Sequence, residues 1–559
     1  MRRQVMNSGA KPTATPSTII APISGLNIRD PLANMQSRYA LVLDNFFPRA
    51  SDLQLRKGYV LYSSCYDIDH KDRPPFVRLL SYAPATSTGN CLFAVSDEGF
   101  IKLDTNKHTA PVLKIDSPAT NGLWQSVNFS NGGGDWLWCC CGDGVNKARV
   151  YDGTKWTILD SASTPALDYS TEWVDVCSFK RRLWLARRNS DVLYYLDVLA
   201  IAGVEKKENT TLYSLPLGSL WNRGGSIIKI MNLTLDSGSG ADDYLCIFST
   251  EGQVAVYKGN NPNNDNDWGL VGIYDIPKPL SANCFIKYGG DIILMTENGL
   301  LAFSEMFQTI EIKHSIMSSA IIHNAWLEAV DRLRLVGEEK GLTLQQVGQY
   351  CSLCLYGEQN MLICNFLHDF RINEETGEPK YTYIQYVLNT ASRAWCRFKD
   401  LHMSAFTNHR DSVYCVSDRY FYKFWEGYTD GKSYITAIMK TAYIFPSGRG
   451  TNSRITLIRP TFQTQVMNVK YSLVIDSDYK ELQRLKTPST ITGARPTGIW
   501  DEALWDEAYW VGEPRVSQDW TTISHYIGKA MSLRLKIASR GQEVLLVGFD
   551  LITQSGGMI

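Results

Sequence analysis

The segment Trp500–Trp510, WDEALWDEAYW, places tryptophans beside carboxylates in an echo of five residues. Paired carboxylates are the groups that cleave glycosidic bonds, and aromatic faces offer a stacking surface for a sugar. The acids of such a site are Asp501, Glu502, Asp506 and Glu507. A spacing of five residues, however, gives neither one helix face nor one strand face. The pattern therefore favours the other interpretation, in which the tryptophans anchor an irregular loop on a sheet and the acids face solvent.

Cys351, Cys354 and Cys364 raise the possibility of a thiolate metal site, because zinc binds cysteine pairs two residues apart. Here the pair lies in a predicted strand, where positions i and i+3 face opposite sides, and no second CxxC or paired histidine follows. Core thiols are the favoured interpretation. The full set of thirteen cysteines is odd in number and scattered through predicted strands, which indicates reduced thiols rather than a disulfide framework.

The remaining candidates for chemistry are weak. The sequence has no G-x-S-x-G elbow, and its eight histidines (70, 108, 314, 323, 368, 402, 409 and 525) lack metal-ligand spacing. Gly132–Gly134 lacks the Lys-Ser/Thr of a phosphate loop. Two basic clusters, Lys180–Arg182 and Arg187–Arg188, can contact DNA or a neighbouring subunit, although a solvated face is favoured. We therefore predict no catalytic, cofactor-binding or metal residues, and a protein that is not an enzyme.

The elements that position all these residues are recurring hairpins. An apolar β-run, a polar tight turn and a second aromatic or β-branched run return six times, and the first three copies start 45 and 46 residues apart. A hairpin of this kind cannot bury its own apolar face, so the copies must pack against one another. The six copies are Leu92–Leu103, Leu137–Tyr151, Leu183–Leu196, Leu245–Tyr257, Ile292–Phe303 and Val413–Phe424. The pattern predicts an all-β protein with a β-propeller of roughly six blades, a seventh remaining possible.

Three regions follow from changes in pattern along the chain. Residues 1–60 form an N-terminal arm and platform segment, and residues 61–445 form the propeller. An insertion at about 305–350 includes an amphipathic helix over Ser315–Val336, which has apolar spacings of three and four. After a turn-rich linker, residues 446–559 alternate as strands and predict a small β-sandwich platform, completed by the N-terminal segment.

Charge and hydropathy exclude some functions. Basic and acidic residues number 56 and 57, so the chain lacks the positive field of a tight nucleic-acid binder, but a near-neutral wall suits a channel through which DNA slides. The 64 aromatic residues favour strands and a large core. The chain has no apolar run of about 18 residues that would span a membrane, so we expect no stable membrane insertion. Because the N-terminus lacks the apolar core of a secretory signal, we expect assembly in the cytoplasm.

Both ends of the chain resemble tail proteins of short-tailed bacteriophages. At the N-terminus the resemblance lies in Ala21–Leu32 (APISGLNIRDPL), Leu43–Arg49 (LDNFFPR) and Leu55–Tyr59 (LRKGY). At the C-terminus it lies in the repeated Trp-Asp pairs at 500 and 505 and in Arg534–Gln542 (RLKIASRGQ). These matches bracket the repeats, while the middle of the chain matches only in pattern.

This resemblance implies a tail nozzle of the tubular protein B type. It implies a propeller body with a platform made from the chain ends, and a hexameric ring below the adaptor and portal proteins. Such a ring continues and gates the DNA ejection channel, contacts genomic DNA transiently and carries fibres or spikes, so the expected location is the virion tail. The alternatives are a propeller-type glycosidase acting through the segment at 500–510, and a polysaccharide-binding propeller. The polar hairpin turns vary too much to repeat one ligand set, which disfavours the last of these.

Overall fold

The computed structural model describes residues 14–64, 75–86, 89–103, 115–205, 211–236, 241–308, 319–372, 379–464, 469–481, 483–486, 488, 515–517, 520–522 and 527–555. Strands make up 53% of the structure and helices 8%, which confirms the all-β class. The chain divides into two compact units. The platform unit contains residues 1–60, 387–399 and 425–559, and the propeller unit contains residues 61–386 and 400–424.

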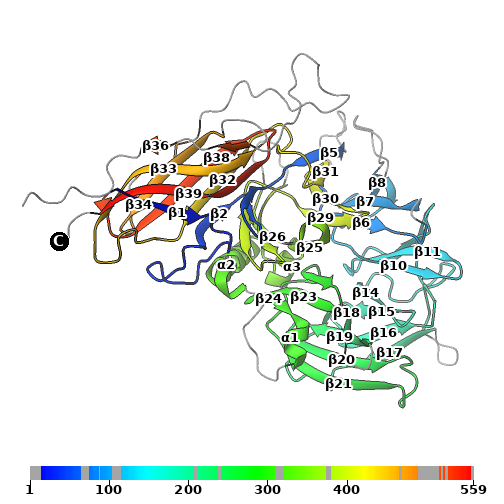
Figure 1. Ribbon diagram of the computed structural model, residues 1–559. Helices are drawn as coiled ribbons and strands as arrows, with labels where there is room; N and C mark the ends of the chain where they lie inside the picture. The colour runs from blue at the N-terminus through cyan, green and yellow to red at the C-terminus, as the bar shows by residue number, and fades with distance from the viewer. Residues whose placement is uncertain are drawn as a thin grey trace, which may run out of the picture. The chain divides into compact units, whose positions relative to one another are not determined.

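Four blades of the propeller unit are four-stranded antiparallel sheets in chain order (Figure 1). The first blade contains β6(Arg78–Tyr82), β7(Cys91–Ser96), β8(Gly99–Leu103) and β9(Ile115–Pro118), and the second contains β10(Gln125–Asn131), β11(Gly134–Cys140), β12(Arg149–Tyr151) and β13(Trp156–Ile158). The third contains β14(Trp173–Phe179), β15(Arg182–Arg187), β16(Val192–Leu196) and β17(Leu212–Pro216). The fourth contains β18(Ile227–Asp236), β19(Ala241–Ser249), β20(Gln253–Gly259) and β21(Trp268–Asp275).

Two further sheets complete six separate blades. One is three-stranded, with β22(Phe285–Tyr288), β23(Asp291–Thr296) and β24(Gly299–Ala302). The other joins β29(Ala405–His409), β30(Ser412–Ser417) and β31(Tyr420–Phe424) to β5(Tyr59–Ser64), a strand that precedes all the blades in the sequence. Because β29 contacts β6 of the first blade, the ring closes, and the predicted propeller of roughly six blades is confirmed.

The long gap between the fifth and sixth hairpins holds another sheet. It contains β25(Ser352–Tyr356), β26(Met361–Ile372) and β27(Pro379–Asn389), with a 3₁₀ turn at Gly357–Gln359. Its first strand, β25, contacts β22 on one side and β29 on the other, so this sheet stands at a seventh position in the ring. The sequence pattern of residues 351–366 and 381–398 predicts strands that share the sixth blade with Val413–Phe424, but in the structure that hairpin pairs with β5 instead.

Neighbouring blades meet through apolar side chains, as the repeat required. Between the second and third blades, Trp138, Trp173 and Leu183 lie in one fully buried cluster. Between the third and fourth, Trp184 and Ile247 do the same. Each hairpin thus buries its face against the next copy.

The inserted helix differs in position from its prediction. Helix α2 spans His323–Lys340 and ends at Gly341, whose φ of 66° caps the helix in the left-handed conformation. Ser319–Ile322 forms a 3₁₀ turn, and residues 315–318 lie outside the described part. The apolar spacing located the buried face, but the cap decided the end. Two short helices, α1(Phe303–Gln308) and α3(Leu344–Gly348), flank this element.

The platform unit contains two sheets. One has the order β3(Phe46–Pro48), β4(Leu53–Leu55), β39(Val544–Ser555), β33(Ser453–Thr464), with β1(Ala14–Ile20) on β39 and β35(Arg515–Ser517), β36(Thr521–Thr522) and β37(Ile527–Gly528) on β33. The other has β28(Trp395–Phe398), β2(Ala40–Asp44), β32(Ile435–Thr441), β38(Met531–Ser539) and β34(Tyr471–Ser477). Burial alternates along β33 and β38, and the rings of Phe462 and Tyr471 meet across the sheets at 5.5 Å.

The boundaries of the platform unit differ from those expected. It begins again at Trp425 rather than at 446, and it takes in Val387–Lys399 from the middle of the chain. The reason is pairing, because β32 lies between β2 and β38 and β28 pairs with β2. A turn-rich stretch at 446–450 therefore lies within the unit.

Candidate functional site

Four of the motifs that carry the family resemblance, those at 21–32, 43–49, 55–59 and 534–542, lie in the platform unit. Asn45 has a φ of 59°, in the left-handed region that asparagine tolerates. Its Nδ2 donates hydrogen bonds to the carbonyls of Lys399, at 3.1 Å, and Thr436, at 2.7 Å. Its Oδ1 accepts from the backbone N–H of Lys399 and from Nε of Arg56, both at 2.9 Å. One buried amide thus joins three distant segments with all its hydrogen-bonding capacity used.

Arg56 continues this connection. Its side chain is 1% exposed, and its two terminal nitrogens donate to the two carboxylate oxygens of Asp430 at 2.7 and 2.5 Å. A second pair, Arg397 with Asp44, closes at 2.6 Å between β28 and β2. Bidentate arginine–carboxylate pairs are strong and directional. We refer to Asp44, Asn45, Arg56, Arg397 and Asp430 as the polar junction.

Two glycines of the same motifs permit close approach of the backbone. A Cβ on Gly58 would lie 1.8 Å from the carbonyl oxygen of Thr429. Gly25 has a φ of 83°, and a Cβ there would lie 2.5 Å from the carbonyl oxygen of Trp395. Only glycine fits at either position.

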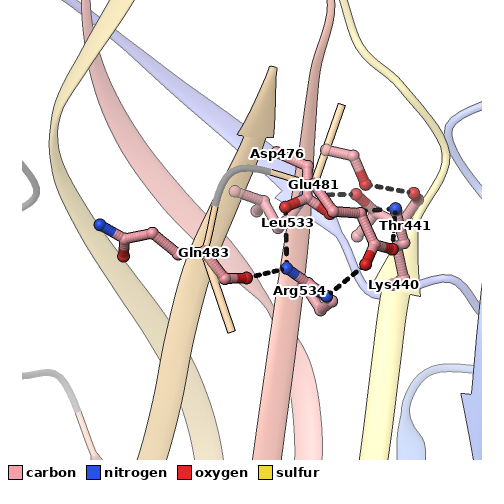
Figure 2. Close-up of polar contacts among 8 residues, drawn as sticks. Lys440, Thr441, Asp476, Glu481, Gln483, Leu533 and Arg534 are labelled. Carbon is pink, nitrogen blue, oxygen red and sulfur yellow. Dashed lines mark hydrogen bonds and ion pairs between the residues drawn. The ribbon is translucent and has the colours of Figure 1, made fainter. Parts of the chain in front are cut away.

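The C-terminal motif Arg534–Gln542 supplies a second polar network (Figure 2). Lys440 and Arg534 lie directly opposite each other on β32 and β38, which places like charges side by side. The fully buried Asp476 of β34 accepts a hydrogen bond from Arg534 and forms an ion pair with Lys440, with N–O distances of 3.0 Å each. The exposed Glu481 contacts the same two cations at 2.9 Å each. These four side chains form the ion-pair cluster, in which charges of opposite sign alternate.

Hydrogen bonds behind the ion-pair cluster fix its geometry. The hydroxyl of Thr441 accepts from the backbone N–H of Leu533 at 3.0 Å, and Ser532 donates to the carbonyl of Thr441 at 2.7 Å. The hydrogen bond from Lys440 holds the pKa of Glu481 below its usual value. The cluster therefore favours the charged form of Glu481.

A third polar arrangement holds the N-terminal strand. Strand β1 is exposed along most of its length and pairs with β39. Its Thr18 donates to Asp550 at 2.8 Å, and Arg459 donates to the same carboxylate at 2.6 Å. The Arg459 guanidinium lies 4.8 Å from the ring centre of Trp520. A line of side chains across β1, β39 and β33 thus fastens the arm to the sheet.

The centre of the propeller unit contains its own polar network. Asp175 of β14 is fully buried and accepts from Lys229 of β18 at 2.7 Å. Lys229 also donates to Gln125 of β10 at 3.0 Å, and Gln125 donates to Asn283 beside β22. Burial raises the pKa of Asp175, with Lys229 opposing it. First strands of separate blades are thereby connected across the ring.

The sequence candidates have mixed outcomes. Cys351, Cys354 and Cys364 are buried thiols, and burial raises the pKa of Cys354 to about 12, which bears out the core interpretation. None of the twelve described cysteines forms a disulfide. Throughout the described residues, no three His, Cys, Asp or Glu side chains gather as metal ligands would. The segment 500–510, with Asp501, Glu502, Asp506 and Glu507, lies outside the described part.

Lysines and arginines of the two basic clusters form ion pairs and hydrogen bonds with other residues of the propeller unit. Lys180 pairs with Asp243 at 2.8 Å, and the nearly buried Arg182 donates to a backbone carbonyl. Arg187 pairs with Glu172 at 2.5 Å. Among the histidines, His409 is buried with its Nδ1 2.8 Å from the Ser81 hydroxyl. None of the described helices is long and apolar enough to cross a membrane.

Comparison with known proteins yields structural neighbours only. No family model and no curated protein matches the chain. The BBS1N domain in complex with ARL6DN has a TM-score of 0.27 at 15% identity, over 45% of this chain and 74% of that one. A Bacteroides uniformis protein named as a candidate 6-phosphogluconolactonase has 0.30 at 10%, over 66% and 92%. Chaetomium thermophilum Raptor has 0.25 at 8%, over 62% and 23%. Similarity this low carries no argument about function.

Proposed function

We propose that this chain is a structural virion protein that forms the tail nozzle ring of a short-tailed phage. The ring continues and gates the DNA ejection channel and bridges the adaptor to fibres or spikes. The observation that supports the proposal best is that the two ends of the chain build one compact unit. The residues that carry the family resemblance, including Asn45, Arg56 and Arg534, hold that unit together.

The mechanism is mechanical rather than catalytic. A closed ring of blades resists deformation, so the propeller unit acts as a rigid wall element. The chain ends connect copies to one another and to the adaptor, and loops facing the lumen block it until the tail engages its receptor. The proposed assembly is a homo-oligomer, a hexamer by resemblance, with transient contact to genomic DNA.

Deletion of residues 1–24 tests the proposal. This change removes β1 and the Thr18 contact to Asp550, whereas the blades of the propeller unit keep all their strands. We expect a folded, soluble protein whose rings, imaged by negative-stain microscopy with the adaptor present, are fewer or lost. Circular dichroism serves as the control for folding. Rings as abundant as those of the full-length protein would contradict the role of the arm, and a full-length protein that forms no ring would contradict the nozzle.

The glycosidase alternative has its own test. Asp501→Asn, Glu502→Gln, Asp506→Asn and Glu507→Gln are combined in one variant, and release of reducing sugars from host-surface polysaccharide is measured. We expect no cleavage by either protein, since the acids are interpreted as a solvated face. Cleavage by the natural sequence that the combined variant loses would replace the structural role with an enzymatic one.

A further inference from the structure

Strand β21 of the propeller unit has an unusual outer edge. It is the last strand of the fourth blade, and none of the described strands pairs with its outer side. Leu270, Val271 and Ile273 are 41%, 43% and 39% exposed. From Trp268 to Tyr274 the strand carries no charge and no proline. Such an edge is a ready template for another strand.

The other three blades built from four consecutive strands protect the same position. Strand β9 is four residues long and carries the exposed Asp116 and Pro118. Strand β13 has three residues, and β17 ends in the exposed Pro216. Short length, charge and proline are the usual means of blocking an edge. Only β21, among these four outer strands, is eight residues long and uncharged from Trp268 to Tyr274, ahead of its last residue Asp275.

A hollow of about 530 Å³ opens where β21 begins. Four carboxylates line it, from Asp242, Asp243, Asp265 and Asp267, against the two lysines Lys180 and Lys258. Each lysine already pairs with a carboxylate, Lys180 with Asp243 and Lys258 with Asp242, at 2.8 Å. The rim of the hollow therefore keeps an acidic excess beside an apolar edge.

We propose that residues 1–13 of a second copy of this chain bind along the outer edge of β21. This inference rests on the homo-oligomer of the proposed function. Residues 1–13 include Arg2, Arg3 and Lys11 and no acid, so their charge complements the acidic rim. Their Val5 and Met6 supply apolar side chains for the strand edge. In this binding mode an extended peptide adds a strand, the backbone gives affinity and alternate side chains give specificity.

The length of the arm agrees with this mode. Thirteen extended residues reach at most about 45 Å beyond Ala14, where β1 begins. Strand β21 needs only about 27 Å of partner for its eight residues. An arm fastened by Thr18 to its own platform unit therefore has enough chain to span the edge of a neighbour.

Edge substitutions test the proposal. Val271→Lys places a charge of the same sign as the arm on the edge, and we expect self-association, measured by sedimentation velocity, to weaken about tenfold, as for an interface that acquires an unpaired charge. Ser214→Lys, on the exposed edge of β17, is the matched control and should change nothing. Arg2→Glu with Arg3→Glu should weaken association like Val271→Lys, and adding Asp265→Lys should restore part of it. Equal association of Val271→Lys and Ser214→Lys would overturn the proposal.

Cross-linking identifies the occupant. One copy carries Val5→Cys, the other Val271→Cys, and the oxidised mixture is run on a non-reducing gel with each single variant as control. A dimer-sized band formed only in the mixture supports the proposal. Cross-links confined to a doubly substituted single chain would show that the arm binds its own propeller, which overturns it. Rings that form normally without the cross-link would refute this contact and leave the nozzle standing, whereas absence of rings refutes the nozzle itself.

Discussion

Neighbouring blades of the propeller unit pack through tryptophans and aliphatic side chains around one central polar network. The distant segments of the platform unit are joined, in addition to their apolar contacts, by several buried charges and amides. Trp184, between the third and fourth blades, is fully buried in an apolar cluster. Arg56, between the N-terminal segment and the segment at 430, is just as buried in a bidentate ion pair. The first kind of contact tolerates many neighbours of similar volume, and the second accepts one partner in one geometry.

The difference follows from how each unit is connected. Blades are local hairpins, so their strands find each other at short sequence separation and need only a nonpolar face to associate. The platform unit joins strands that lie hundreds of residues apart, such as β2 with β32 and β1 with β39. Directional polar contacts can select the correct partner among many apolar strands, at a cost in desolvation. We regard the polar junction as the device that sets this register.

Among the substitutions that test this difference, we expect Arg56→Ala to lower the stability of the platform unit the most. It removes both side-chain donors from the Asp430 carboxylate and leaves the Asn45 Oδ1 with the Lys399 N–H alone. Removing one partner of a buried pair costs about 5 kcal/mol. Hydrogen exchange followed by mass spectrometry should show the loss in platform peptides and not in blade peptides. Arg29→Ala, which breaks the exposed pair with Asp30, is the control and should cost at most about 1 kcal/mol. Equal losses from the two changes would remove the distinction between the units.

Trp184→Ala should give the converse pattern. Truncation of a fully buried tryptophan costs about 4 kcal/mol through lost burial and the cavity left behind. We expect faster exchange in the third and fourth blades, with the platform peptides unchanged. Val198→Ala, at an exposed position of the third blade, should leave exchange as it was. Destabilisation spread evenly over both units would mean that they unfold as one body.

Asp550 offers a smaller, pH-dependent effect. Hydrogen bonds from Arg459 and Thr18 lower the pKa of this carboxyl in the folded protein. Its contribution to stability is therefore present above the unfolded value, near about pH 4, and is lost as the pH falls through the folded value. Protease protection of residues 14–20 should decline over that range, by less than about 1 kcal/mol for a partly exposed pair. Asp550→Asn should flatten this dependence of protection on pH. If the dependence is unchanged in the variant, the Asp550 contact does not hold the arm.

The sequence predicted structural elements formed by residues close together in the chain better than pairings between residues that are far apart in it. The hairpin repeats are local, and each of the six observed blades contains a predicted copy as two successive strands, with the helix-bearing gap after Ile292–Phe303 in the right place. The helix itself begins at His323 rather than at 315, because periodicity marks a buried face and not the residue at which the backbone turns. The pairing partners of β25–β27 and of the closing strand β5 lie far away in the sequence, so local pattern could not predict them.

The polar junction was only half visible in the sequence. Asn45, Arg56 and Gly58 stood in segments marked by the family resemblance, but their partners did not. Asp430 and Arg397 lie in segments without a distinctive motif, and Asp476 is one acid among many. The available signal for such a buried ion pair was a charged residue inside an otherwise apolar strand. This signal does not identify the residue with which the charge pairs.

The amino-acid order by itself determined that this protein is all-β, that its repeats must pack side by side, and that its apolar faces would be buried, because strand period and turn residues act within a few positions. Only the tertiary structure decided that both chain ends and a middle segment form one unit, which cations face Asp476, and which blade keeps an open apolar edge. Those outcomes depend on charges and backbone groups brought together from distant positions, where Coulomb and hydrogen-bond energies are set by distance in space rather than by separation along the chain.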